Sequence, residues 1–547
     1  MSQRKSLSRA PRADEPRAAN AWSALDRAAS IEFPSGRPHA AEIWLYSDRM
    51  SYAAGDEAIF FVHTTAHTYS IAIHRDGASP QEVLTRSGLQ GVAQETREAA
   101  FRTGARWKES FRFTIPREWP GGVYVVTVVT DDDTLAQVEA EHFFVLRDNE
   151  PGSRSKIALM LCTSTYVAYN DWGGANHYRS IRDGRATDVP EPVLSTQRPW
   201  ARGFARLPIS APRHGKEARL KPFEEPRYPF IEWALTHGYS RHYIDAGWAN
   251  YERHFAVWAE PRGFELEYLT QHDLHDRPEL LDAYRVLVIV GHDEYWSWEM
   301  RDAVDRFVER GGNVARFAGN FIWQVRLESS GTVQVCYKAP TLDPCHDGDR
   351  RHLTTTTWDH PIVNRPSAQT MGLTGAAGVY HRVGGACPRG SGGFTVYRPD
   401  HWVFEGTDLY YGDVFGAAPT SIVSFEVDGL DYTFRDGLPY PTFKDGAPPS
   451  TEILAMAPAI KGEEDRSRGQ RPLLASMTEF EYLSATLPGE PGRGLRATYG
   501  SAMIAVHTRG KGMVLNAGTA SWVNGLIDHD FFTEQITRNV LNRVSHT

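Results

Sequence analysis

Cysteine is scarce in this sequence, with only four among 547 residues: Cys162, Cys336, Cys345 and Cys387. Four cysteines in so long a chain do not build a disulfide framework, so we expect a reducing compartment, the cytoplasm. Cys336 and Cys345 lie close to His346 in the sequence, but a zinc site would need further ligands at regular spacing. The cysteine pattern therefore predicts neither a disulfide scaffold nor a zinc site.

Positive charge and long apolar runs are scarce too. The chain has 59 Lys and Arg against 68 Asp and Glu, which gives a net charge of -9 and argues against nucleic-acid binding. No apolar run approaches the ~20 residues that cross a bilayer, and the charged N-terminus lacks the apolar core of a secretory signal. With 41% hydrophobic and 23% charged residues, the composition is typical of a soluble globular protein.

Several catalytic motifs are absent as well. The sequence has no G-x-S-x-G or G-x-C-x-G elbow, no H-E-x-x-H and no phosphate-binding P-loop. Cys162 follows a predicted strand without flanking glycines, and we interpret it as a buried, unreactive thiol. An amidotransferase-like cysteine enzyme stays as an alternative, which the substitution Cys162→Ala would test.

The length exceeds what one core supports, so we expect two or three domains. Residues 1–37, rich in Arg, Ala, Ser and Pro, predict a flexible arm. Residues 38–148 alternate short strands with Gly, Pro and Asp turns, which predicts an immunoglobulin-like β-sandwich. Residues 155–547 predict a doubly wound, amidotransferase-like α/β domain, within which residues 328–500 form a β-rich insertion or lobe.

The best-defined part of this α/β domain runs from Arg285 to Arg326. Val286–Val290 is a continuous apolar run, typical of a strand buried on both faces. A helix is predicted from near Ser297 to Gly311, and a second strand over Val314–Phe317. Polar residues follow both strands, at the carboxyl ends where open α/β sheets bind ligands.

Imidazole, carboxylate and phenol groups follow the predicted strands. His292 and Glu294 would point the same way from an extended chain, which suits metal binding or acid/base work, unless they only hold a turn. Tyr166, Tyr169 and Tyr178 lie on the predicted loop after the first strand, where they could meet Glu294 or simply pack. Phenolate and carboxylate oxygens favour a hard cation, and two phenolates with one carboxylate would neutralise a trivalent iron.

Four segments within residues 155–545 carry a resemblance to a known family: TYVAYNDWGG, GHDEYWSWEMRDAV, GGNVARFAGNFIWQVR and NAGTASWVNGL. In this order they resemble the large (beta) subunit family of N,N-dimethylformamidase. The resemblance implies a mononuclear non-haem iron, as Fe3+, bound by two tyrosines and one glutamate. It also implies hydrolysis of a small N-alkylated amide to an amine and a carboxylic acid.

Matched motif by motif, the resemblance implies three metal ligands. Glu294 is the glutamate of G-H-x-E-Y, and Tyr169 rather than Tyr166 is the first tyrosine. Tyr178, which follows the double glycine, is our choice for the second tyrosine. The segment Arg198–Trp200 stands at another position where that second ligand could lie.

Three further residues are implied as catalytic. His292 helps beside the metal, Asn320 donates to the oxyanion, and Glu426 is a candidate general base, unless it is a loop carboxylate facing water. The aromatic residues nearby suit a small, weakly polar substrate, or are only packing: Tyr166, Trp172, Trp296 and Trp323.

The alternatives for function and partners stay open at this point. The same metal site could act on another amide, an ester or a cyclic substrate, since fold-level likeness does not fix a substrate. The chain could also be a non-catalytic module that binds carbohydrate or protein through its aromatic residues. The resembled enzyme pairs its large chain with a small helical subunit, and we expect a homo-oligomer without nucleic-acid or membrane partners.

Overall fold

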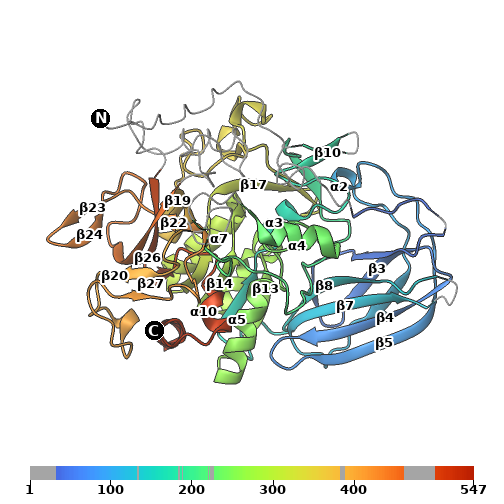
Figure 1. Ribbon diagram of the computed structural model, residues 1–547, viewed down its shortest axis with the longest axis horizontal. Coiled ribbons are helices and arrows are strands. Elements are labelled where there is room, and N and C mark those ends of the chain that lie inside the picture. Colours follow the sequence, from blue (N-terminus) through green and yellow to red (C-terminus); the bar gives the residue numbers. More distant parts are fainter. Residues whose placement is uncertain are drawn as a thin grey trace, which may run out of the picture.

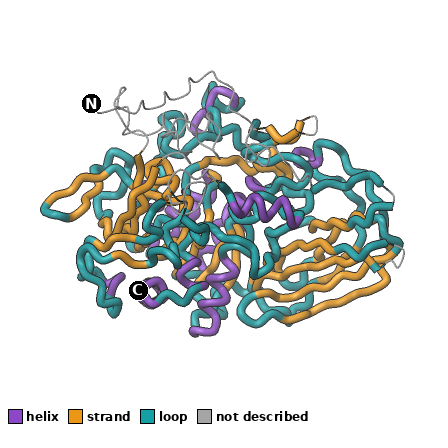
Figure 2. Tube along the Cα trace, in the orientation of Figure 1, coloured by secondary structure: helices purple, strands orange, loops and turns teal. Residues whose placement is uncertain are grey.

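The structure is a computed structural model. It describes residues 32–37, 39–131, 135–182, 185–187, 189–219, 221, 227–381, 389–460 and 499–546. Most of the predicted arm and Cys387 lie outside these residues. The N-terminal strands and a larger mixed sheet lie on opposite sides of the view, with helices between them (Figures 1 and 2).

The N-terminal strands form two sheets around a shared core. One sheet has the order β1-β3-β6 and the other the order β2-β8-β7-β4-β5. The elements are β1 (Ile43–Ser47), β2 (Ser51–Ala53), β3 (Glu57–Thr64), β4 (Thr68–Asp76), β5 (Gln81–Gln90), α2 (Ala100–Thr103), β6 (Phe111–Thr114), β7 (Gly122–Thr130) and β8 (Glu139–Arg147).

Strand β7 shows how these sheets join the rest of the molecule. Tyr124 and Val126 face the core shared by the two sheets, whereas Val123 and Val125 face the core of the larger mixed sheet. Because strand side chains alternate between faces, burial on both sides explains why this segment reads as a nearly continuous apolar run.

Strand β8 carries a buried histidine that should make stability depend on pH. The Nε2 atom of His142 lies 2.8 Å from Ser47 Oγ, and burial lowers the pKa of His142 to about 3. Above pH ~6.5 both folded and unfolded states hold it neutral. As the pH falls from there towards 3, only the unfolded chain takes up the proton, so stability drops by up to about 1.4 kcal/mol per pH unit.

His142 lies next to the rings of Phe60 and Phe143, so a phenylalanine suits its surroundings. The substitution His142→Phe should therefore remove the contribution of His142 to the pH dependence of stability. We expect the urea midpoint of the variant to fall less steeply between pH 7 and pH 5 than that of the parent chain. Equal slopes for the two proteins would contradict the assignment.

The larger sheet is parallel at one end and antiparallel at the other. Its order is β13-β9-β14-β16-β27-β26-β25-β19-β22; outside this order, β20 pairs with β25, and β21 pairs with β20. Pairings are parallel from β13 to β27 and antiparallel from β27 to β22. Its strands are β9 (Ile157–Leu161), β13 (Glu267–Thr270), β14 (Val286–His292), β16 (Asn313–Gly319), β19 (Thr374–His381), β20 (Phe394–Val396), β21 (Val414–Phe415), β22 (Phe425–Gly429), β25 (Glu452–Ile460), β26 (Tyr499–Arg509) and β27 (Gly512–Asn516).

The antiparallel end comes largely from the region 328–500, which the sequence predicts to be β-rich. Strands β19, β22 and β25 extend the central sheet itself. Smaller sheets lie beside it, built from β10 (Ser180–Arg182), β11 (Arg185–Thr187), β12 (Val193–Ser195), β15 (Tyr295–Ser297), β17 (Trp323–Glu328), β18 (Val333–Val335), β23 (Tyr432–Arg435) and β24 (Leu438–Pro441).

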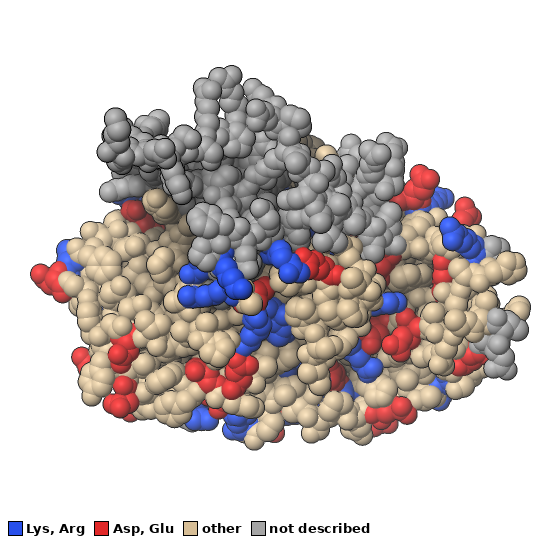
Figure 3. Space-filling model, in the orientation of Figure 1, with Lys and Arg blue, Asp and Glu red and all other residues tan. Residues whose placement is uncertain are grey.

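Helices pack around the parallel half. They are α3 (Thr163–Tyr169), α4 (Pro229–His237), α5 (Glu252–Ala259), α6 (Gln271–Asp276), α7 (Trp298–Arg310), α8 (Ala368–Met371), α10 (Val523–Ile527) and α11 (Phe531–His546), with 3-10 turns η1 (Glu260–Arg262), η2 (Pro278–Ala283), η3 (Pro340–Leu342), η4 (Arg351–Leu353) and η5 (Trp402–Phe404). Of the described helices, none has the length and apolar character needed to cross a membrane. Acidic and basic side chains are interspersed on the face that Figure 3 shows.

The predicted β-α-β unit is confirmed in detail. Strands β14 and β16 are buried along their whole length and pair in parallel. Helix α7 begins after Ser297, whose hydroxyl accepts a hydrogen bond from Met300 N, and ends at Gly311 in the left-handed region. The prediction of a loop after the first strand was wrong, because residues 163–169 form the fully buried helix α3.

Candidate functional site

The candidate site lies beyond the carboxyl ends of β9, β14 and β16. Helix α3 follows β9 directly and ends at Tyr169, and β14 ends at His292. Gly291 bends the chain just before His292: its φ is +82°, and a Cβ there would lie 2.3 Å from the Tyr251 side chain. Glycine is therefore required where the strand turns towards the site.

Two phenols and one carboxylate meet at this position. The Tyr169 hydroxyl donates to Glu294 Oε2 at 2.9 Å, and the Tyr178 hydroxyl donates to Glu294 Oε1 at 2.5 Å. The two hydroxyl oxygens are 3.0 Å apart. Tyr169 and Glu294 are buried, and Tyr178 is partly exposed. The structure thus brings together all three residues that the resemblance implies as metal ligands.

These three side chains form a triangle in which four oxygens take part: the two phenol oxygens and both oxygens of Glu294, with contacts of 2.5–3.0 Å between them. Phenol and carboxylate oxygens are the kind of ligand that a hard cation prefers. Burial, followed by the charge of Glu294, raises the pKa of the Tyr169 phenol well above its usual value. A phenolate at this position therefore requires a cation beside it, and Tyr169, Tyr178 and Glu294 could hold that ion.

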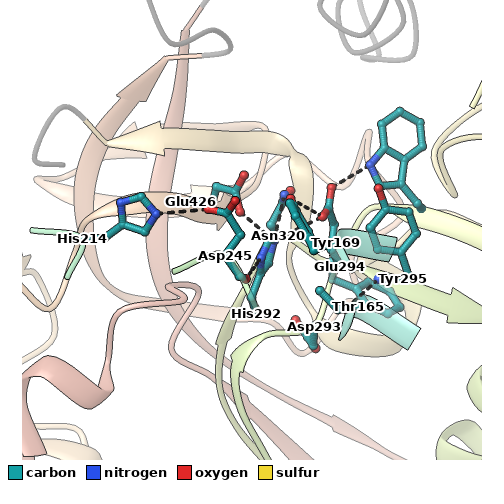
Figure 4. Close-up of polar contacts among 12 residues, drawn as sticks. Thr165, Tyr169, His214, Asp245, His292, Asp293, Glu294, Tyr295, Asn320 and Glu426 are labelled. Atoms are coloured by element: carbon teal, nitrogen blue, oxygen red, sulfur yellow. Dashed lines mark hydrogen bonds and ion pairs between the residues drawn. The ribbon is translucent and has the colours of Figure 1, made fainter. Parts of the chain in front are cut away.

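An imidazole and a second carboxylate adjoin this triangle (Figure 4). His292 Nε2 lies 2.6 Å from Glu426 Oε2 and 3.4 Å from Glu294 Oε2, while Nδ1 lies 2.7 Å from the Asp245 carbonyl oxygen. Burial opposes protonation of the ring, but the two carboxylates outweigh it and raise the pKa of His292 to about 10. Glu426 is buried, so the alternative of a carboxylate facing water is wrong.

Asn320 completes the predicted set. It directly follows β16 with a positive φ of 66°, which asparagine tolerates better than most residues. Its Nδ2 lies 3.4 Å from His292 Nε2, and its backbone N–H donates to Asp428 Oδ1 at 2.7 Å. Its Oδ1 has no hydrogen-bond partner among the described residues. A small pocket beside these groups is lined by Tyr178, Glu294, Asn320, Ile322, Trp323, Val379, Tyr380 and Glu426.

A buried arginine ties both sides of the site together. Arg316, in the middle of β16, donates to Asp293 Oδ2 at 2.8 Å and to Asp428 Oδ2 at 2.5 Å, and all three side chains are fully buried. Asp293 stands between His292 and Glu294 and points away from them, as strand alternation predicts. Asp428 also accepts a hydrogen bond from the Asn320 backbone. Arg316 therefore links the segment that carries His292 and Glu294 to the one that carries Asn320.

Sequence reasoning missed the residues that position the two tyrosines. Asn176 Nδ2 donates to the Tyr169 carbonyl oxygen at 3.1 Å, and Asn176 Oδ1 accepts from Tyr178 N at 2.9 Å. Arg198, at the other position considered for the second ligand, is buried and donates to the Asn170 carbonyl oxygen at 2.9 Å. The short distance in sequence between Tyr169 and Tyr178 could have predicted that a single turn links the two tyrosines.

Two more neighbours act on the triangle. Trp323 Nε1 donates to Glu294 Oε1 at 2.7 Å. The buried Lys338 places Nζ 3.3 Å from the ring centroid of Tyr178 and 4.8 Å from that of Trp323, a cation–π arrangement. No local sequence pattern predicts that Lys338 lies beside these rings, because the turn before η3 brings it there.

The other candidates lie apart from the site. The Tyr166 hydroxyl donates to Glu252 Oε2 at 2.5 Å, away from Glu294. Cys162 is fully buried, and burial raises the pKa of its thiol well above the usual value, which suits an unreactive thiol. Among the residues that the structure describes, no group of three or more His, Cys, Asp or Glu side chains is arranged to hold a metal ion. Cys336 and Cys345 therefore belong to no such group.

Sequence comparison relates the chain to a known family. Residues 68–534 match the family described as N,N-dimethylformamidase beta subunit-like, C-terminal. The chain belongs to this family. The N,N-dimethylformamidase beta subunit of an Alcaligenes species is 23% identical to it over 472 residues, or 80% of this chain and 54% of that subunit. The beta subunit of Paracoccus aminophilus is 23% identical over 377 residues, or 64% of this chain and 44% of that subunit.

This dimethylformamidase beta subunit-like chain thus spans about half the length of the curated relatives it matches. Among solved structures, the sporulation control protein Spo0M of Bacillus subtilis matches 20% of this chain and 49% of its own at 11% identity, with a TM-score of 0.15. That likeness is too low to bear on the fold or the site.

Proposed function

We propose that this chain is an iron-dependent amide hydrolase that cleaves a small N-alkylated amide, of the N,N-dimethylformamide type, to an amine and a carboxylic acid. The observation that carries the proposal is the triangle of the Tyr169, Tyr178 and Glu294 side chains, beside the His292–Glu426 pair. The names of the relatives supply the substrate class. The apolar and aromatic pocket walls, which include Ile322, suit a small and weakly polar substrate.

Tyr169, Tyr178 and Glu294 would hold the iron, and two phenolates with one carboxylate would balance three positive charges. A ferric ion held there would supply Lewis-acid chemistry, which polarises a carbonyl oxygen and lowers the pKa of water. Trp323 and Asn176 keep the ligands oriented, through a hydrogen bond to Glu294 and through bonds to both tyrosine backbones.

The remaining residues move protons and stabilise charge. Glu426 takes one proton from the attacking water as the new C–O bond forms, and delivers it to the nitrogen as the C–N bond breaks. His292 holds Glu426 in place and keeps a positive charge beside the developing oxyanion. Asn320 donates its amide N–H to that oxygen, an interaction typically worth about 2.7–4 kcal/mol in such sites.

Two finer points belong to this proposal. We infer that the two N-terminal sheets form an immunoglobulin-like sandwich and that residues 155–547 form an amidotransferase-like domain. Because the relatives are named beta subunits, we also infer that this chain works in a complex with a second kind of subunit, which the family resemblance suggests is small and helical.

A pair of tyrosine variants tests the ligand assignment. Tyr178→Phe should lose the iron and at least about a hundredfold in activity, because even residues that only support metal ligands contribute about 10–100-fold. Tyr166→Phe, in the same helix as Tyr169, should keep both, since its hydroxyl contacts Glu252 instead. Metal content, the visible tyrosinate-to-iron band and hydrolysis rates measure the outcome. Iron-free parent protein, or equal effects of the two variants, would contradict the proposal.

A further inference from the structure

Strands β23 and β24 form a two-stranded hairpin that projects at the left end of the molecule (Figure 1). All four residues of β23 are exposed. Among the strands that the structure describes, none other pairs with this hairpin. An exposed strand edge presents unpaired N–H and C=O groups, which are a template for pairing with another chain.

The two prolines of β24 determine which edge is open. Tyr432 pairs with Pro441, and Phe434 pairs with Pro439. Since proline has no N–H, these cannot be the pairs that exchange two hydrogen bonds. The N–H and C=O groups of Tyr432 and Phe434 must therefore point outwards, away from β24.

Neighbouring contacts agree with this alternation. Thr433 lies opposite Tyr440, so this pair exchanges the hydrogen bonds within the hairpin. Two residues earlier, the Asp431 carbonyl oxygen accepts from Thr442 N at 3.0 Å. Residues 431 and 433 thus bond inwards, and the outer edge of β24 is closed by its prolines while that of β23 is open.

The open edge is complementary to itself. When β23 is laid antiparallel against a second copy, with a two-fold axis through Thr433, Tyr432 of one copy lies opposite Phe434 of the other. Both residues point their N–H and C=O groups at this edge, so the hydrogen-bond register matches. In the same register Thr433 faces Thr433, and Asp431 faces Arg435, so the aromatic, hydroxyl and opposite-charge pairs are all favourable.

We propose that two copies of this chain associate through β23, which joins their hairpins into one four-stranded antiparallel sheet. The axis is perpendicular to the sheet, so the aromatic side chains of both copies gather on one face. Further aromatic rings continue this face. The ring centroid of Tyr397 lies 5.4 Å from that of Phe434 and 5.7 Å from that of Tyr411. Tyr411 is 55% exposed and the adjacent Tyr410 68% exposed, which enlarges the apolar surface that the dimer covers.

A cysteine cross-link tests the register. Thr433 would face its own copy in a pair that exchanges no hydrogen bonds, with Cα atoms about 4.5 Å apart, which is within disulfide range. Thr433→Cys should therefore give a reducible covalent dimer under mild oxidation. The matched control Tyr432→Cys should not, because it faces residue 434 of the second copy. Equal cross-linking of both variants, or of neither, would overturn the proposal.

Charge variants test the pairing without a cross-link. Arg435→Asp alone should weaken self-association about tenfold or more, since two attractive pairs become repulsive, and Asp431→Arg alone should do the same. A mixture of the two variants restores both opposite-charge pairs and should form heterodimers. Sedimentation velocity over a concentration series measures this. A parent chain that stays monomeric throughout, or single variants that dimerise as well as the parent, would refute the β23 interface.

Discussion

On the proposed function, replacing Glu294 with alanine is expected to abolish iron binding and to lower amide hydrolysis at least about a thousandfold. Its carboxylate lies within 3 Å of both phenol oxygens and also accepts the Trp323 N–H. Without it, two neutral phenols cannot balance a trivalent ion in a buried site. Metal analysis after gel filtration, together with release of the amine from the amide, measures both effects.

The control for this prediction is Glu299→Ala. Glu299 belongs to the same segment, but its side chain is 55% exposed, and its Oε2 lies 3.4 Å from Nδ1 of His275 in α6. On the same proposal, this variant should keep the metal content and the activity of the parent chain. Circular dichroism should show the parent fold for both variants, and a Glu294→Ala protein with full activity would refute the site.

The second large effect is on stability, from the substitution Arg316→Met. Arg316 is fully buried between Asp293 and Asp428. Removing the cation leaves two buried carboxylates without a counter-charge, which typically costs about 3–5 kcal/mol. We expect a lower urea midpoint for unfolding. Because Asp293 and Asp428 hold the segments that carry Glu294, His292 and Asn320, activity should fall even in the folded fraction.

Arg310→Met provides the comparison for Arg316→Met. Arg310 pairs with Asp282 at the surface, where both side chains are more than half exposed. Such pairs contribute about 0–1 kcal/mol, so the unfolding midpoint should barely move. Similar midpoints for the two variants would show that the buried arginine does not hold the site together.

The sequence predicts the β-α-β unit well because its signals are local. The buried runs of β14 and β16 and the Ser297 and Gly311 ends of α7 each depend on neighbouring residues only. Helix α3 was missed because its seven residues are buried on all sides, so no apolar stripe marks a helix.

The same difference between local and distant signals applies to the residues of the site. His292, Glu294 and Asn320 could be placed because they lie within a few residues of the ends of predicted strands. Glu426 comes to them from β22, at the antiparallel end of the sheet, and this contact between distant segments has no local signature. For this reason only the family resemblance, and not the spacing of residues, suggested Glu426.

The order of strands in the central sheet has a consequence for synthesis of the chain. Strand β16 pairs with β27, so that Val314 meets Val514. A ribosome that has completed β14, α7 and β16 must still translate most of the antiparallel half before β27 emerges. Until then this edge of β16 stays unpaired, so the parallel and antiparallel halves of the sheet join only after residues 512–516 have left the exit tunnel.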